Sequence, residues 1–154
     1  MSYFYGTKVN CYVDDATSTL RITDTSVAPS VGTYYFSDYV DLGSSLKVRV
    51  TINFDVTRYN SSALLFDGLT GLFDSLTGLF DALTGGSNFD DTNVVTYISI
   101  TNDDPAGTPV WSDYQIFQAS DFYGRAFRFK VELRSESLDT TPSISSLSAK
   151  IQYN

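Results

Sequence analysis

The chain contains no histidine among its 154 residues, and it has a single cysteine, Cys11. Without histidine, neither a Ser-His-Asp triad nor a Cys-His pair can be built, and a zinc site lacks its usual ligands. One cysteine also excludes an internal disulfide. Because Cys11 alternates with Val9 and Val13, we expect it to be a small buried side chain rather than a reactive thiol.

Basic residues are missing from the middle of the chain. No lysine or arginine occurs between Tyr59 and Gly124, and the aspartates of that segment account for the net charge of −8. This balance argues against nucleic acid, because phosphate binding needs cations. We expect a solvated acidic face; a cation site or an acidic partner-binding face is the alternative, and the best calcium candidates are Asp90, Asp91, Asp103 and Asp104.

Long apolar runs are also lacking. No stretch approaches the length of a membrane span, so we expect no membrane partner. The first ten residues, MSYFYGTKVN, do not have the basic-then-apolar order of a signal peptide. If the protein acts outside a cell, we expect it to leave by another route, such as lysis.

Alternating apolar and polar residues predict strands along most of the chain. In residues 46–59, Val48, Val50, Ile52, Phe54 and Val56 are expected on one face, with polar residues on the other. Residues 125–135 repeat the pattern, with Phe127, Phe129, Val131 and Leu133 inward and Arg128 and Lys130 exposed. Further strands are expected at residues 9–13, 18–23, 33–43, 93–101, 111–118 and 143–153, with a turn at 14–17 and a loop at 102–109.

These patterns predict one domain over residues 1–154. One wet face per strand is typical of antiparallel sheets, so we expect an all-β, antiparallel two-sheet sandwich of the jelly-roll kind. An insertion at residues 64–86 interrupts it. There the unit Leu-Phe-Asp-x-Leu-Thr-Gly occurs three times in tandem.

The insertion admits two structures. Its leucines follow a formal heptad spacing, which would suit one amphipathic helix. Against that helix stand Gly71, Gly78 and Gly85, each costing about 1 kcal/mol in a helix interior relative to alanine. Aspartate as an N-cap and glycine past a helix end instead favour three tandem turns. A calcium solenoid fits less well, because one aspartate per seven residues supplies too few oxygens.

Candidate catalytic groups are weak. Asp14–Asp15, Asp90–Asp91 and Asp103–Asp104 are sequential pairs, and neighbouring residues on a strand point to opposite faces. A glycosidase needs carboxylates that face each other, so turn formation is the better interpretation. Trp111 could stack on a sugar, but we favour a core position for it. We therefore predict no catalytic, cofactor-binding or metal-binding residue, and no enzyme activity.

Three motifs in order carry a resemblance to a known family. They are TNDDPAG-P-WS-Y--F from Thr101, GRAFRFKVEL from Gly124, and TP-IS-LSA-I from Thr141. Together with residues 34–60 and the recurring Gly-Leu-Phe-Asp of the insertion, they resemble a domain of tail and tail-fibre proteins of tailed bacteriophages, including those described as host-specificity proteins. The resemblance covers roughly residues 30–152.

The resemblance implies a β-sandwich module of a virion, in a tail, fibre or related appendage, with no enzymatic residues. We expect a non-enzymatic structural protein that is made in the host cytoplasm, incorporated into the virion and bound to other virion proteins. A host-glycan-binding module is the second hypothesis, and a polysaccharide-cleaving enzyme is the third. The apolar insertion needs a partner surface, so we predict a homo-oligomer, a trimer by family analogy, that contacts through Leu65, Phe66, Leu72, Phe73, Leu79 and Phe80.

Overall fold

The computed structural model describes residues 4–60, 92–138 and 140–153. All regular structure in these residues is β-strand and all strand pairs are antiparallel, which confirms the all-β prediction. The strands are β1 (Thr7–Val9), β2 (Cys11–Asp14), β3 (Thr19–Ile22), β4 (Ser30–Tyr35), β5 (Val40–Asn60), β6 (Thr92–Thr101), β7 (Gln115–Ile116), β8 (Ser120–Ser135) and β9 (Thr140–Tyr153).

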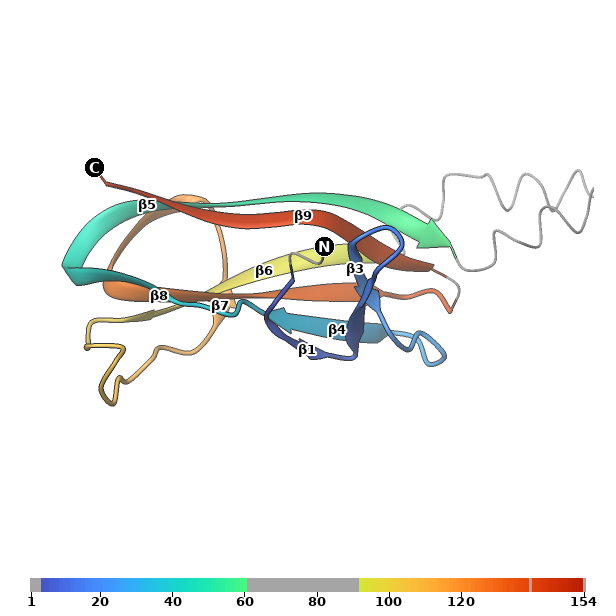
Figure 1. Ribbon diagram of the computed structural model, residues 1–154, viewed down its shortest axis with the longest axis horizontal. Coiled ribbons are helices and arrows are strands. Elements are labelled where there is room, and N and C mark those ends of the chain that lie inside the picture. Colours follow the sequence, from blue (N-terminus) through green and yellow to red (C-terminus); the bar gives the residue numbers. More distant parts are fainter. Residues whose placement is uncertain (1–3, 61–91, 139, 154) are drawn as a thin grey trace, which may run out of the picture.

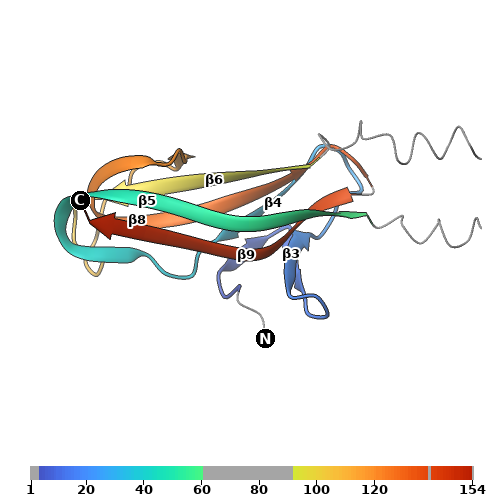
Figure 2. The same ribbon diagram turned by 90° about the horizontal axis from the view of Figure 1, so that it is seen from above.

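The described strands form one sheet that curls on itself. Their order is β1-β4-β8-β5-β9-β3-β2, with β6 on the second edge of β8 and β7 beyond β6. The terminal strands β1 and β2 are joined through Asn10, so the curled sheet is nearly closed (Figures 1 and 2). The predicted pair of separate jelly-roll sheets is not confirmed, because β5 belongs to both layers.

β5 makes this crossing because its backbone is irregular near its start. It pairs with β8 at Val40 and Asp41, and the register then shifts before Leu46. Gly43 in this bulge has φ of +79°, a conformation that glycine adopts without strain, and its N–H donates to Oδ1 of Asp41 at 2.9 Å. From Leu46 to Val50 the strand pairs with β8 again, and from Val48 to Asn60 it pairs with β9.

Two clusters of apolar side chains fill the space between the layers. The prediction for β8 is confirmed, since Phe127, Phe129, Val131 and Leu133 are all buried. Val131 and Leu133 pack with Leu20 and Ile144 in one cluster, whereas Phe127 and Phe129 pack in the other with Val48, Val50 and Ile98. Cys11 is buried in the first cluster, as expected.

The alternation predicted for β5 holds only in part. Val48 and Val50 are fully buried, but Val56 is 44% exposed. The pairing with β9 shifts register between Asp55 and Val56, where β9 contributes the extra residue Ser145. Val56 still lies opposite the buried Ile144, but it belongs to neither core cluster, so burial along this face ends before β5 does, and an alternating sequence pattern does not reveal where.

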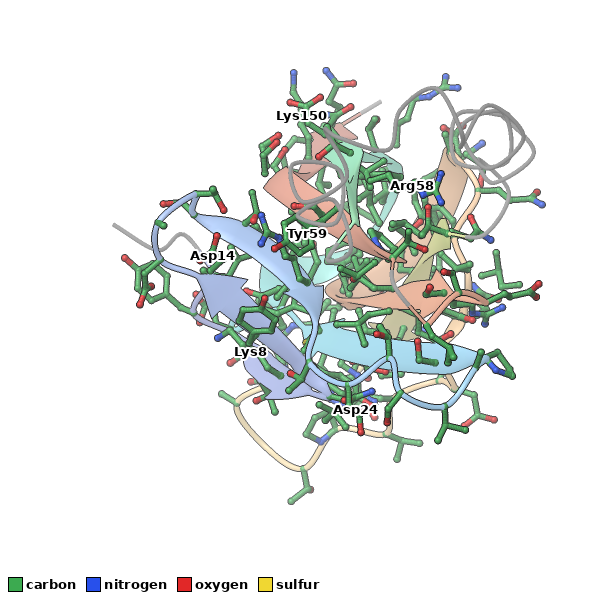
Figure 3. The ribbon with its side chains drawn as sticks, turned by 90° about the vertical axis from the view of Figure 1, so that its right-hand side faces the viewer. Lys8, Asp14, Asp24, Arg58, Tyr59 and Lys150 are labelled. Atoms are coloured by element: carbon green, nitrogen blue, oxygen red, sulfur yellow. The ribbon has the colours of Figure 1, made fainter. Side chains whose placement is uncertain are left out.

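The turn at residues 14–17 and the loop at 102–109 lie where they were predicted, whereas the strand expected at 111–118 is reduced to β7. The hairpin of β2 and β3 packs against the end of β5. There the guanidinium carbon of Arg21 lies 3.7 Å from the ring centroid of Tyr59. Figure 3 shows Tyr59 beside the hairpin, next to Asp14 at the end of β2.

The repeat at 64–86 lies outside the described residues, so the choice between helix and turns stays a prediction. Its flanks are described. Asn60 pairs with Thr140 and Thr92 pairs with Ser135, and the Ser135 hydroxyl donates to the Thr140 carbonyl at 2.6 Å. Both flanks therefore leave from the same end of the sheet, separated by about three strand spacings, on the order of 15 Å.

Candidate binding surface on the outer face of β8

Along the second half of β8, the side chains that point away from the core are charged. They are Arg128, Lys130, Glu132 and Arg134, and they alternate with the buried residues of the same strand. Arg128 and Lys130 were predicted to be exposed, and this is wrong. Both are half-buried, and the Lys130 side chain is only 17% exposed. Aromatic rings from other elements cover them.

Lys130 lies between tyrosines of its two neighbouring strands. Tyr35 on β4 and Tyr97 on β6 are both in direct register with it. Its Nζ lies 4.7 Å from the ring centroid of Tyr97, 4.9 Å from that of Tyr114 and 5.9 Å from that of Tyr35. Aromatic faces attract a desolvated cation through their quadrupoles, so these contacts stabilise a lysine that has lost much of its water.

Arg128 is enclosed in a similar way by the loop after β6. Its guanidinium carbon lies 4.6 Å from the Trp111 ring centroid and 4.9 Å from that of Tyr114. Its Nε donates to the Ser99 hydroxyl at 3.1 Å, and that hydroxyl donates to the Ser112 carbonyl at 2.6 Å. The loop is thus fixed to the outer face of β8 and β6.

Glu132 connects the two cations that flank it on β8. Its Oε2 accepts hydrogen bonds from Arg134 Nη2 at 2.6 Å and from the Tyr97 hydroxyl at 3.0 Å, and Lys130 Nζ lies 3.7 Å from Oε1. Burial raises the pKa of Glu132, but these hydrogen bonds and neighbouring cations outweigh burial and hold the pKa below its ordinary value. The network keeps the carboxylate ionised and acceptor-only.

The loop from Asn102 to Ala119 is ordered by its own polar groups. Asp103 Oδ2 accepts from the Val110 N–H at 2.8 Å, and Asp104 Oδ1 accepts from the Ala106 N–H at 3.0 Å. Arg125 Nη2 also lies 3.3 Å from Asp104 Oδ1. These two calcium candidates therefore serve as turn-forming carboxylates, which was the favoured interpretation of the sequential pairs.

The other candidate residues are placed less completely. Trp111 is in neither core cluster, so the prediction of a core position is wrong. It is half-buried on the outer face, where Arg128 lies over its ring and the Tyr39 ring centroid is 6.2 Å away. Asp90, Asp91 and the six repeat residues predicted to contact a partner lie outside the described residues. In the described ranges, no group of three or more His, Cys, Asp or Glu side chains could hold a metal ion.

The aromatic cover of β8 was missed by sequence reasoning, although it left a signal. Tyr35 follows the buried Tyr34, and Tyr97 precedes the buried Ile98. Period-two alternation alone would therefore have assigned both rings to the outer face. What it could not supply was the position of Trp111 and Tyr114, which reach this face through a loop.

Apolar side chains remain exposed around this surface. Val110 is 79% exposed, Ile116 63% and Tyr39 46%. Val110 and Ile116 lie in the segment that carries Trp111 and Tyr114, and Tyr39 lies against Trp111. Tyrosine, tryptophan and arginine on a preorganised backbone are typical of protein contact surfaces. We call these residues, Tyr39, Val110, Trp111, Tyr114 and Ile116, the aromatic loop surface.

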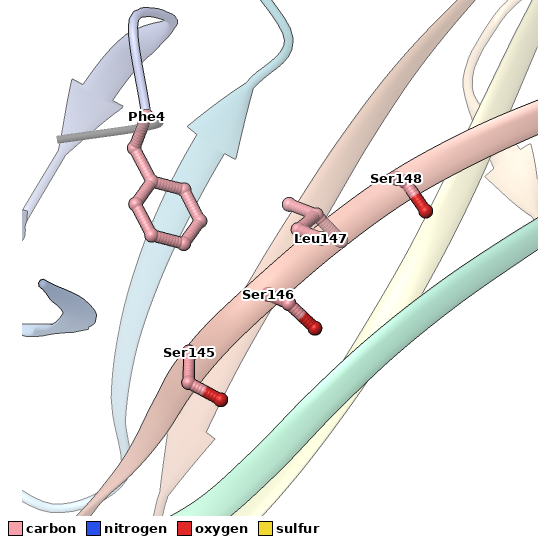
Figure 4. A pocket seen from close by; sticks show the side chains of 5 residues that line it. All are labelled: Phe4, Ser145, Ser146, Leu147 and Ser148. Atoms are coloured by element: carbon pink, nitrogen blue, oxygen red, sulfur yellow. The ribbon is translucent and has the colours of Figure 1, made fainter. Parts of the chain in front are cut away.

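A pocket of about 330 Å³ lies elsewhere, between the N-terminal arm and β9. Phe4 lines one side of it, and Ser145, Ser146, Leu147 and Ser148 line the other (Figure 4). It contains no carboxylate and a single ring, so it does not have the paired acids of a glycosidase or the aromatic platform of a typical sugar site.

Comparison with known proteins adds no assignment. In the described part of the chain, no helix is long and apolar enough to cross a membrane. The chain matches no protein-family model, no curated protein and no solved structure.

Proposed function

We propose that this chain is a non-enzymatic structural protein of a phage virion, a component of a tail, fibre or related appendage that assembles through oligomer contacts. The support comes from the sequence resemblance together with one structural observation. The motif TNDDPAG-P-WS-Y--F forms a loop fixed to the outer face of β8, and this loop carries every member of the aromatic loop surface except Tyr39. In this proposal the curled sheet is a variant of the jelly-roll-like sandwich that the resemblance implies.

The aromatic loop surface suits assembly better than catalysis. Its backbone is held by the Asp103 and Asp104 carboxylates and by the Ser112 hydroxyl, which accepts from the Ile100 N–H at 2.9 Å. A rigid surface loses little conformational entropy on binding. Its exposed members, Val110 and Ile116, gain by burial at about 25 cal/mol per Å².

The insertion supports the same proposal from the sequence side. Its leucines and phenylalanines need a partner surface, and its flanks leave from one end of the sheet, opposite the end where β9 finishes (Figure 1). We propose that other virion proteins and further copies of this chain meet the module there, with a trimer as the expected homo-oligomer.

Glycan recognition is the second candidate, because Tyr39 and Trp111 form a partly exposed aromatic pair with Asp113 two residues further along. Against it, Arg128 covers one region of the Trp111 ring that a sugar would need. Screening the chain on a glycan array tests this candidate: binding that Trp111→Ala abolishes would favour recognition over assembly.

Electron microscopy of intact phage particles, labelled with an antibody against the folded chain, tests the main proposal. Label at the tail, its fibres or an appendage is the expected result. Particles that carry no label, while the antibody detects the free protein in the infected cell, would contradict a structural role.

A further inference from the structure

β9 has one edge that is open over most of its length. Along its other edge it pairs with β5 from Thr140 to Tyr153. On the open side, β3 meets it at the single pair Leu20 and Ile144. From Ser145 to Tyr153, no strand in the described part of the chain pairs with this edge. In an antiparallel strand paired on one side, alternate N–H and C=O groups then point outward and are free to accept another strand.

Part of the open edge borders a pocket, which we call the slot. The 330 Å³ pocket lies along Ser145–Ser148, and Phe4 forms its far wall (Figure 4). Lys8 fixes this wall, since its Nζ donates to the carbonyl oxygens of Phe4 at 2.8 Å and of Gly6 at 3.1 Å. The slot is thus a gap in the nearly closed sheet, between β9 and the arm that leads into β1.

The side chains beside the slot differ between the two faces of β9. Leu147, Ala149 and Ile151 are half-buried and pack against the core clusters. Ser146, Ser148 and Lys150 are exposed on the other face. An added strand in register would alternate in the same way, with small apolar side chains next to Leu147 and Ala149 and polar ones next to Lys150.

The polar face beside the slot is basic. Lys150 and Arg49 are exposed there, in adjacent rows of β9 and β5, and neither belongs to an ion pair found among the described residues. Lys8 adds a third cation at the Phe4 wall. Of the nearby acids, Asp14 lies 3.4 Å from Arg21, whereas Asp55 accepts from the Ser146 hydroxyl at 2.9 Å and keeps its charge, so the three cations outnumber one acid. An occupant with acidic residues would complement this charge.

We propose that the open edge of β9 binds an extended segment of another polypeptide by strand addition, and that this segment alternates small apolar with acidic residues. Backbone pairing gives the affinity, and the slot and the basic face select the sequence. The inference does not depend on the proposed virion role, because it rests only on the edge, the slot and the charges.

Peptide binding to the isotope-labelled full chain tests this site. The probe is a blocked heptapeptide of alternating valine and aspartate, and a valine–lysine heptapeptide is its matched control. We expect the acidic peptide to shift amide resonances of Ser145–Tyr153 and Phe4 and to slow hydrogen exchange at alternate residues of β9. Lys150→Glu should weaken its binding about tenfold or more, and should raise that of the lysine peptide.

Arg134→Gln is the control variant, because it removes one positive charge on the outer face of β8, remote from the slot; it is compared with Lys150→Gln. Weaker binding in Lys150→Gln alone supports the site. Equal weakening in both variants would mean that only net charge matters, and would overturn it. No shift with either peptide, or shifts without slower exchange in β9, would overturn the proposal.

Discussion

The Arg21 guanidinium lies 3.7 Å from the ring centroid of Tyr59, and it also contacts two hydroxyl groups and one carboxylate. Its Nε donates to the Ser143 hydroxyl, its Nη2 donates to the Thr17 hydroxyl, and its Nη1 lies 3.4 Å from Asp14. One side chain therefore links the β2–β3 hairpin to β9 and to the last residues of β5 before the insertion.

Replacing Arg21 should test how much this tie stabilises the fold. The side chain is only 9% exposed, and Arg21→Met would remove the cation beside Asp14 and the donor to the Ser143 and Thr17 hydroxyls, whereas Asp14 would keep its hydrogen bond from Thr17. We expect a loss of about 2–4 kcal/mol in the free energy of unfolding, measured by urea denaturation. A double-mutant cycle with Tyr59→Leu should give a coupling of about 0.5–2 kcal/mol; a coupling near zero would mean that the ring contact is incidental.

Phe129 is the sharpest test of the core. Because it is buried between the layers, Phe129→Ala should destabilise the protein by about 3–5 kcal/mol. Val56→Ala, at a position that is 44% exposed, is the comparison and should change stability by less than about 0.5 kcal/mol. Similar effects for the two variants would show that the register of β5 or β8 is wrong.

Gly124 leaves no room for a methyl group. A Cβ at this position would collide with Cγ2 of Ile100 on the neighbouring strand. Gly124→Ala should therefore cost about 1–3 kcal/mol, read from the shift of the thermal midpoint. The double variant with Ile100→Ala should lose less than the sum of the two single losses, and strict additivity would argue against the contact.

Glu132 makes stability depend on acid. Its pKa in the folded chain is held below its ordinary value of 4.5, so its contribution is fully present above that value. The contribution is lost as pH falls through the lower folded-state pKa, which places the effect from about pH 5 downward. Thermal midpoints measured over this range in the same buffers should fall less steeply for Glu132→Gln than for the parent. All other carboxylates are common to the two proteins and contribute equally to both curves. If the thermal midpoints of the parent and the variant fall in parallel with pH, Glu132 does not contribute to the loss of stability in acid.

The insertion should govern assembly. Deleting residues 65–84 and joining the ends with a short Gly-Ser linker should leave the β-rich circular dichroism and the unfolding transition nearly unchanged, because loop closure varies slowly with length. Light scattering should then report a smaller particle than for the parent chain. If the deletion variant assembles as well as the parent, the interface lies elsewhere, and Ile116→Ser on the aromatic loop surface becomes the next variant to examine.

The strands that the sequence pattern identified best are those with strict alternation and no bulge. Phe127 to Leu133 is such a run, and its burial follows from the period of two alone. Val56 was misplaced because it lies near the end of β5, beyond the two core clusters, and alternation does not show where the cover of a strand ends. The continuity of β5 between layers also depends on a local feature, Gly43, whose φ the pattern does not encode.

The surface of β8 was mispredicted for a different reason. Alternation correctly sends Lys130 outward, but exposure depends on what else covers that face. Trp111 and Tyr114 reach it from a loop whose shape is set by hydrogen bonds to Asp103 and Asp104. The alternating pattern of the strands carries no information about these loop contacts. Non-local coverage of this kind follows from tertiary structure alone, and it turned two expected solvent-facing cations into the centre of an aromatic cluster.

The long pairing of β5 with β9 has a mechanical consequence. The insertion begins beyond Asn60, at one end of this pair, whereas Tyr153 ends β9 at the other, opposite Val48. A pull between the insertion and the C-terminal end therefore acts along both strands in opposite directions. Under such shear the hydrogen bonds of the pair carry the force together instead of opening one after another. We therefore expect force spectroscopy along this axis to find the domain far stronger than when the hairpin of β2 and β3 is peeled away.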